Sequence, residues 1–242
     1  MFLNLAAYLF VDLDDLADRR ARIHAAGEHE RLKGTVLLAP EGINLVVSGE
    51  ADAARRWRDQ LKSDRAFAAL DCKESWSSGI AFDRWKVKVK REIITLRQPD
   101  IRPQDGRAAS VSAQTLAIWL ERGHDDDGRP VRLVDTRNDF EVDAGSFDHA
   151  VDLRLTSFTD FPRAAQALAP ALTGQRVVTF CTGGIRCEKA ALLMTRMGIE
   201  HVVQLDGGVL RYFEHTDGRH WRGDLFVFDK RVGVDHRLDP AQ

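Results

Sequence analysis

The chain has 242 residues, of which 44% are hydrophobic and 30% charged, a composition typical of one large or two small domains of a soluble protein. No run approaches the ~20 apolar residues of a membrane helix, and the N-terminal MFLNLAAYLFVDLDD lacks the basic start of a signal peptide. Three cysteines at irregular spacing argue against a disulfide framework and favour a reducing cytoplasmic location. We expect no membrane partner. A net charge of −2 does not by itself indicate nucleic-acid binding.

Strands and helices alternate in the first part of the chain. Apolar runs predict strands at 5–11, 35–39, 43–47, 70–76 and 85–96. Helical spacing predicts helices from 13 to about 27, with Asp12 as the N-cap, and over 50–61. The order β-α-β-β-α-β indicates a ferredoxin-like, or acylphosphatase-like, α+β domain over residues 1–97.

Four cations line one side of the last of these strands, because strand side chains alternate between faces. These candidate RNA-binding residues are Arg84, Lys86, Lys88 and Lys90. Two interpretations stay open: an edge strand protected from aggregation, or a stripe that contacts phosphates. Residues 1–98 hold 17 Lys+Arg against 15 Asp+Glu, and residues 99–242 hold 18 against 22, so an RNA-binding role suits the first part better.

A polar segment with two prolines, QPDIRPQDGR, marks a linker over residues 98–109. Beyond it the pattern predicts a helix capped by Ser112, a strand at 131–135, a helix within 158–172 with Pro162 in its first turn, and strands at 177–180 and 201–205. This alternation favours a parallel sheet with helices on both faces. The second domain is expected over 110–225, followed by a C-terminal tail over 226–242.

The stretch VVTFCTGGIRCEKAALLMTRMG at 177–198 carries the chemistry. Cys181 directly follows a buried strand, at the end where open α/β sheets bind ligands. Its thiol should have a pKa below ~8.5, because the backbone amides that follow it, a helix N-terminus and the Arg186 cation all stabilise the thiolate. Cys181 would then be a nucleophile within an anion-binding loop. The candidate anion loop comprises Thr182, Gly183, Gly184, Ile185 and Arg186.

Two other interpretations of this cysteine compete. One is a buried structural cysteine beside a glycine turn. The other is a cysteine phosphatase, whose phosphate loop needs the spacing C-x5-R, whereas Cys181 and Arg186 are spaced as C-x4-R. The shorter loop should be too small for a phosphate.

The motif C-x-x-G-x-R, formed by Cys181, Gly184 and Arg186, resembles the active-site loop of rhodaneses, and VRLVDTR at 131–137 resembles the rhodanese stretch before it. The longer CTGGIRCEK at 181–189 resembles the rhodanese-domain bacterial tRNA uridine(34) hydroxylases, and LLAPEGINLVVSG at 37–49 resembles their N-terminal domain. The resemblance implies an α/β protein with a rhodanese-like second domain. It also implies Cys181 as the persulfide site, tRNA as partner, and molecular oxygen as co-substrate for C5 hydroxylation of the wobble uridine.

The remaining candidate residues support this site. Asp135 and Arg137 are expected to tie loops together as a buried ion pair beside Cys181; a direct part in catalysis is the alternative. Cys187 is either a small residue that faces the core or a resolving thiol for Cys181. The histidines lack metal-ligand spacing, and no flavin, haem or iron motif is present, so neither a metal nor a bound cofactor is expected.

Three functions remain open. The resemblance favours oxygen-dependent tRNA hydroxylation. The chemistry of the loop more directly supports a sulfurtransferase that moves sulfane sulfur through a Cys181 persulfide, with a sulfur donor or reductant as a further partner. A non-catalytic RNA-binding adaptor is the third, and the intact Cys181 weighs against it.

Overall fold

The structure is a computed structural model that describes residues 1–240 and divides the chain into two compact units. The first unit contains Met1–Thr95 together with Phe228–Arg231, and the second contains Leu96–Val227 and the chain from Val232 on. The segment expected as a linker at 98–109 lies in the second unit. The segment expected as a tail contributes to both, and its Arg231 donates a hydrogen bond of 3.1 Å to the Ser75 hydroxyl in the first.

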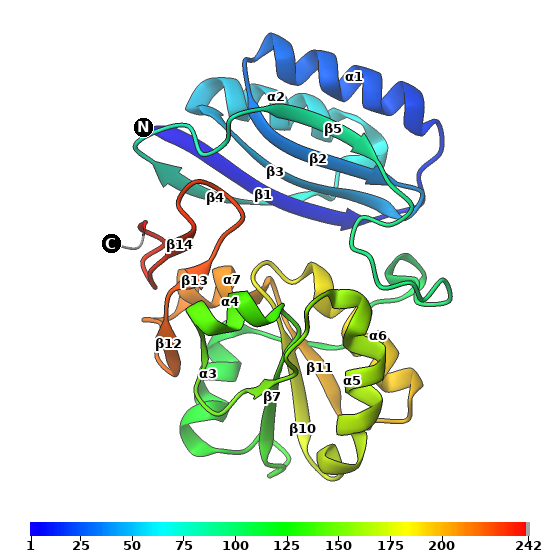
Figure 1. Ribbon diagram of the computed structural model, residues 1–242, viewed down its shortest axis with the longest axis vertical. Helices are drawn as coiled ribbons and strands as arrows, with labels where there is room; N and C mark the ends of the chain where they lie inside the picture. Colours follow the sequence, from blue (N-terminus) through cyan, green and yellow to red (C-terminus); the bar gives the residue numbers. More distant parts are fainter. Residues whose placement is uncertain (241–242) are drawn as a thin grey trace. The chain divides into compact units, whose positions relative to one another are not determined.

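The first unit is a five-stranded sheet with both of its helices on one face (Figure 1). The strand order is β4-β1-β3-β2-β5, in which the first four strands pair antiparallel and β5 adds in parallel beside β2. This arrangement confirms the expected ferredoxin-like class and extends it by one edge strand. The elements are β1 (Phe2–Phe10), α1 (Leu16–His29), β2 (Lys33–Ala39), β3 (Gly42–Glu50), α2 (Ala51–Ser63), the 3-10 helix η1 (Arg65–Phe67), β4 (Asp71–Ser77) and β5 (Trp85–Val89).

Aromatic packing fixes the two helices and the edge strand to this sheet. Trp57 of α2 is 1% exposed and meets Trp85 of β5 edge to face at 5.7 Å between ring centroids. The Trp85 indole donates a 3.0 Å hydrogen bond to the His24 carbonyl of α1. Gly27 permits this approach, because a Cβ there would lie 2.1 Å from the Trp85 ring.

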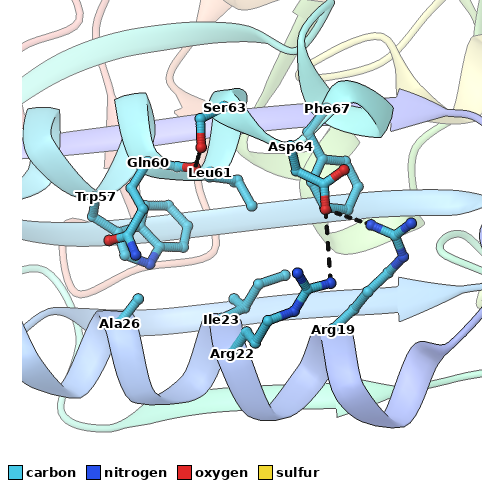
Figure 2. A pocket seen from close by; sticks show the side chains of 10 residues that line it. All are labelled: Arg19, Arg22, Ile23, Ala26, Trp57, Gln60, Leu61, Ser63, Asp64 and Phe67. Carbon is cyan, nitrogen blue, oxygen red and sulfur yellow. Dashed lines mark hydrogen bonds and ion pairs between the residues drawn. The ribbon is translucent and has the colours of Figure 1, made fainter.

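A groove of about 480 Å³ runs between α1 and α2 (Figure 2). At one end, Arg19 and Arg22 reach from α1 towards Asp64, at 2.5 and 3.9 Å from its carboxylate. Arg19 also lies 5.6 Å above the centroid of the Phe67 ring. The cations of this groove are therefore paired within the protein, and their contacts hold the helices together.

The second unit is built on a parallel sheet of order β6-β11-β10-β7-β9, with α3 and α7 on one face and α5 and α6 on the other (Figure 1). This confirms the expected parallel architecture. Its main elements are β6 (Ser110–Val111), α3 (Ala113–Arg122), β7 (Val131–Asp135), α4 (Asp139–Ala144), β9 (Val151–Asp152), α5 (Phe161–Leu168), β10 (Arg176–Phe180), α6 (Ile185–Arg196), β11 (Val202–Leu205) and α7 (Gly208–His215). Short pieces complete it: η2 (Pro103–Asp105), β8 (Gly145–Phe147), η3 (Phe158–Asp160), η4 (Ala169–Leu172), β12 (Trp221–Gly223), β13 (Leu225–Phe226) and β14 (Gly233–Val234).

Two expectations for the first unit are wrong. The strand expected at 85–96 ends at Val89, and the apolar residues that follow it fold back, with the Ile93 amide donating 2.7 Å to the Glu41 carboxylate. The N-cap of α1 is Asp15, with a left-handed φ of 47°, rather than Asp12. The reason is that the strand-to-helix connection is tied to the β2–β3 turn, where the Leu13 amide donates 2.9 Å to the Pro40 carbonyl.

The helix expected within 158–172 is broken into three pieces, η3, α5 and η4. Pro162 lies in the first turn of α5, as expected. Pro170 lacks the amide hydrogen that a continuing α-helix needs, and the chain tightens into η4 around it. In the part of the chain that the structure describes, no helix is long and apolar enough to cross a bilayer.

Candidate active site around Cys181

Cys181 follows the central strand of the parallel sheet. It comes directly after β10, which pairs with β7 on one side and β11 on the other. The loop turns at Gly184, whose φ is 99°, and α6 begins at the next residue. The Gly184 amide donates a 3.1 Å hydrogen bond to the Cys181 sulfur. The sulfur thus lies inside the turn that opens α6, as the sequence predicts.

The surroundings of Cys181 favour its thiolate. Burial opposes the charged form, but a hydrogen bond from Cys187, the charge of Arg186 and the amides of Arg186 and Gly184 outweigh it. Together they lower the pKa of the Cys181 thiol from 9.0 to about 5. At neutral pH the sulfur is therefore a buried anion whose charge is held by neighbours from its own loop.

Cys187 is the hydrogen-bonding partner of this thiolate. It lies in the first turn of α6 and is fully buried, with its sulfur 3.7 Å from the Thr136 hydroxyl. Burial and the adjacent Cys181 raise its pKa well above the ordinary value, so Cys187 stays a neutral thiol. Of its two expected roles, the core-facing one agrees with this burial, and its contact with Cys181 keeps the resolving role open.

Glu141 of α4 holds the Arg186 side chain. The two carboxylate oxygens accept hydrogen bonds of 2.6 and 2.7 Å from the guanidinium, and both side chains are buried. The same carboxylate accepts 3.1 Å from the Asn138 amide and 3.4 Å from the Thr182 hydroxyl. Two donors of the Arg186 guanidinium are thus committed to Glu141, and Arg186 acts on Cys181 through its charge and through hydrogen bonding.

The first residues of α7 hydrogen-bond to the backbone of the Cys181 loop. The Val209 and Leu210 amides each donate 3.0 Å hydrogen bonds, to the carbonyls of Cys181 and Thr182. Gly208 makes this contact close: a Cβ there would lie 2.5 Å from the Cys181 carbonyl oxygen and 2.6 Å from the Gly184 nitrogen. Neither Glu141 nor Gly208 is among the site residues proposed from sequence. Their available signals are the N-x-x-E capping box at 138–141 and the double glycine at 207–208.

Asp135 and Arg137 form a fully buried ion pair at the end of β7. Arg137 donates to the Asp135 carboxylate at 2.6 and 2.9 Å and to the Gly145 carbonyl at 2.6 Å. Its guanidinium also lies 5.0 Å from the centroid of the Trp221 ring. These contacts tie β7 to the segment that carries α4, which is the structural role expected of this pair.

The outer surface of the loop is partly open. The side chains of Thr182 and Ile185 are half-buried, whereas Cys181, Gly184 and Arg186 are buried. The basic stripe at 84–90 belongs to the other unit, where all four of its cations are exposed. Lys86 and Lys88 lie on the edge strand β5, and Arg84 and Lys90 flank it. Within the second unit, the structure therefore brings the Cys181 loop together with Cys187 and Asp135–Arg137.

The fold and the loop define the second unit as a rhodanese-like domain, and the rhodanese-like domain family model matches residues 116–215. A model described as the UPF0176 acylphosphatase-like domain matches residues 2–93. A tRNA uridine(34) hydroxylase from Bordetella petrii is 55% identical over 98% of this chain and 94% of its own length. A second, from Variovorax paradoxus, is 55% identical over 95% of this chain and 87% of its own length.

The chain therefore belongs to the tRNA uridine(34) hydroxylase family, which confirms the resemblance drawn from the sequence motifs. Among solved structures, the rhodanese-like domain of an Anabaena protein is 19% identical, with a TM-score of 0.39, over 48% of this chain and 80% of its own.

Proposed function

We propose that this protein is a cytoplasmic enzyme that hydroxylates the wobble uridine of tRNA at C5, with Cys181 as the reactive group. The observation that carries the proposal is the match, over nearly the whole chain, to relatives named for this activity. The thiolate environment at the carboxyl end of β10 supports an active rather than a vestigial site.

The reaction sets requirements on its partners. Inserting one oxygen atom of molecular oxygen into the C5–H bond releases the other atom as water, and this takes up two electrons and two protons. A reductant therefore has to accompany tRNA and oxygen. Cys181 is suited to carry sulfur in the same site, because the amides that stabilise its thiolate equally stabilise the anion of a persulfide.

The basic stripe on β5 is proposed as an RNA contact. Its cations lie on the exposed edge of the first unit and alternate with Trp85 and Val87, which face the helices. Lysines spaced two residues apart on one face suit the regularly spaced charges of a phosphate backbone. The same residues also discourage edge-to-edge pairing, so the two roles are compatible.

The proposal is tested by nucleoside mass spectrometry of tRNA from cells that lack this protein. Nucleosides derived from 5-hydroxyuridine should disappear and return when the gene is restored. Growth of the restored strain under heavy-isotope oxygen gas should place the label in the 5-hydroxyl group. An unchanged nucleoside profile in the deletion strain would refute the hydroxylase function.

Sulfur transfer is the second candidate, favoured by the thiolate of Cys181. In that reaction the thiolate attacks the outer sulfur of thiosulfate, the S–S bond breaks, and sulfite leaves with the electron pair. The resulting persulfide passes its terminal sulfur to an acceptor thiolate or cyanide. Robust thiosulfate-to-cyanide transfer by the purified protein, together with unchanged tRNA nucleosides, would select this function.

A further inference from the structure

The sheet of the first unit has a second face, opposite α1 and α2. Across the middle of the sheet, the residues of this face stand outside the core cluster that the helices cover and are half-buried or exposed. Towards one end, Asn4, Ser48 and Ser77 of the same face are buried. We call this face the open sheet face. Its middle part comprises Ala6, Tyr8, Thr35, Leu37, Asn44, Val46, Asp71, Lys73, Lys86 and Lys88.

Strand register arranges this face in two rows that cross all five strands. One row runs Lys73, Ala6, Val46, Thr35 and Lys86. The next runs Asp71, Tyr8, Asn44, Leu37 and Lys88. With strands ~4.8 Å apart, each row is roughly 19 Å long. Apolar and aromatic groups therefore occupy the centre, and lysines lie towards both edges.

Loops cover the two ends of the open sheet face, and one of them reaches the second row at Asn44. At one end the Ala81 amide donates 3.1 Å to the Ser48 hydroxyl. At the other the Asn44 side chain donates 3.3 Å to the Ile93 carbonyl. The rows thus form a bounded surface across the middle of the sheet.

Tyr8, on β1 beside the edge strand β4, is the aromatic group of the two rows. The Lys73 ammonium lies 5.7 Å from the centroid of its ring, and Phe10 meets the ring edge to face at 6.1 Å. These contacts set the ring in a definite orientation beside a cation. Nucleic-acid bases stack on such rings, and neighbouring lysines bind the phosphates of the same strand.

We infer that the open sheet face binds unpaired nucleotides of the tRNA substrate, with one base stacked on Tyr8 and phosphates held by Lys73, Lys86 and Lys88. The inference rests on the proposed function, in which tRNA is the substrate. It extends that function by identifying the surface that binds tRNA and by specifying that the bound nucleotides are unpaired. Charge complementarity favours RNA, because the two rows contain three lysines and one acid, Asp71.

The test is the affinity of the full chain for a labelled anticodon stem-loop RNA, measured by fluorescence anisotropy. Tyr8→Leu should weaken binding by about 5- to 150-fold, the cost of one lost stacking contact, and Tyr8→Phe should bind like the wild type. The matched control is Trp76→Leu, since Trp76 is a 40% exposed aromatic residue on the opposite face of the same sheet. Its replacement should leave affinity unchanged.

A fully paired RNA of the same length separates stacking from charge attraction. Tyr8→Leu should not change its affinity. Three outcomes would overturn the inference. Tyr8→Leu could lose affinity equally for paired and looped RNA, it could bind the stem-loop with wild-type affinity, or the wild-type protein could fail to bind the stem-loop at all.

Photocrosslinking provides a readout that needs no substitution. A 4-thiouridine in the loop of the RNA should crosslink to the peptide that contains Tyr8 in the wild-type protein, and adducts confined to other peptides would contradict the inference. Because both readouts measure binding, they are independent of catalysis. If RNA affinity depends on Tyr8 but the tRNA nucleosides of the deletion strain are unchanged, the open sheet face still binds RNA and only the hydroxylase function is refuted.

Discussion

The carboxylate of Glu141 accepts two hydrogen bonds, of 2.6 and 2.7 Å, from the guanidinium of Arg186 in the interior of the second unit. Arg186 in turn lends its charge to the Cys181 thiolate. Glu141 binds the Arg186 guanidinium, and it thereby positions the cation that helps to keep the sulfur charged. The reactivity of Cys181 therefore depends on a residue from another loop.

Replacing Glu141 by Ala should destabilise the protein strongly. It leaves the Arg186 guanidinium buried without its carboxylate partner, and breaking a buried ion pair in this way costs about 3–5 kcal/mol. Urea unfolding of the second unit measures the loss. Asp143→Ala serves as control, because the Asp143–Arg154 pair is exposed and should contribute far less. Equal effects of the two substitutions would show that Glu141 does not secure the loop.

The Cys181 thiol should titrate far below an ordinary thiol. The thiolate absorbance of wild type minus Cys181→Ser should rise with a midpoint near the pKa of about 5, whereas unfolded protein should titrate near pH ~8.5. Because folding lowers this pKa, the thiolate stabilises the fold fully above ~8.5, and that contribution is lost as the pH falls towards 5. Cys72 does not interfere, since burial raises its pKa to about 11.

Cys187→Ala should move this midpoint upward. The substitution removes the thiol that donates to the Cys181 sulfur while the amide of Gly184 remains. A midpoint near 8.5 in the wild-type protein, or one that does not respond to Cys187→Ala, would contradict the assignment of Cys181 as a thiolate stabilised by its loop.

Gly208→Ala should displace the Cys181 loop. The added Cβ would lie 2.5 Å from the Cys181 carbonyl oxygen, and this backbone cannot move without shifting the sulfur. Persulfide loading after thiosulfate treatment, followed by intact-protein mass spectrometry, should fall sharply. Gly174→Ala is the matched control, because its φ of 74° is similarly left-handed but its Cβ would meet nothing within 4 Å. Normal loading of Gly208→Ala would rule out this support.

Replacing Lys86, Lys88 and Lys90 by Gln should weaken tRNA binding and reduce its salt dependence by about one slope unit for each lost phosphate contact. Affinity at several salt concentrations measures both. The control is the same charge change on the helical side, at Arg22, Arg56 and Arg65, which are exposed. If the two triple variants keep the same affinity and slope, the stripe on β5 serves only as edge protection.

The motif around Cys181 could be predicted from sequence because its parts are contiguous. One strand, one turn and one helix start place the sulfur, two glycines and Arg186 together, whatever the rest of the chain does. Glu141 could not be assigned in the same way, since it reaches Arg186 across 45 positions of sequence through the packing of α4. Gly208 likewise matters only because α7 begins directly beneath the loop.

Long-range contacts also explain the wrong predictions in the first unit. The apolar residues after β5 are typical of a strand. The strand nevertheless ends at Val89, and the Ile93 amide donates its hydrogen bond to the Glu41 side chain instead of to a neighbouring strand. The acidic run at 12–15 contains several candidate caps, and contacts with the β2–β3 turn select Asp15. In both cases tertiary hydrogen bonds, absent from any local window, decide the boundary.

The most direct test of Cys181 as the reacting group of a tRNA hydroxylase is complementation of a deletion strain, read by nucleoside mass spectrometry. Wild type should restore the nucleosides derived from 5-hydroxyuridine, and Cys181→Ser should restore none, because a serine hydroxyl neither ionises at neutral pH nor carries sulfane sulfur. Cys187→Ser should restore them in full or, if Cys187 resolves the persulfide, in part. Full restoration by a stably expressed Cys181→Ser protein would contradict the account.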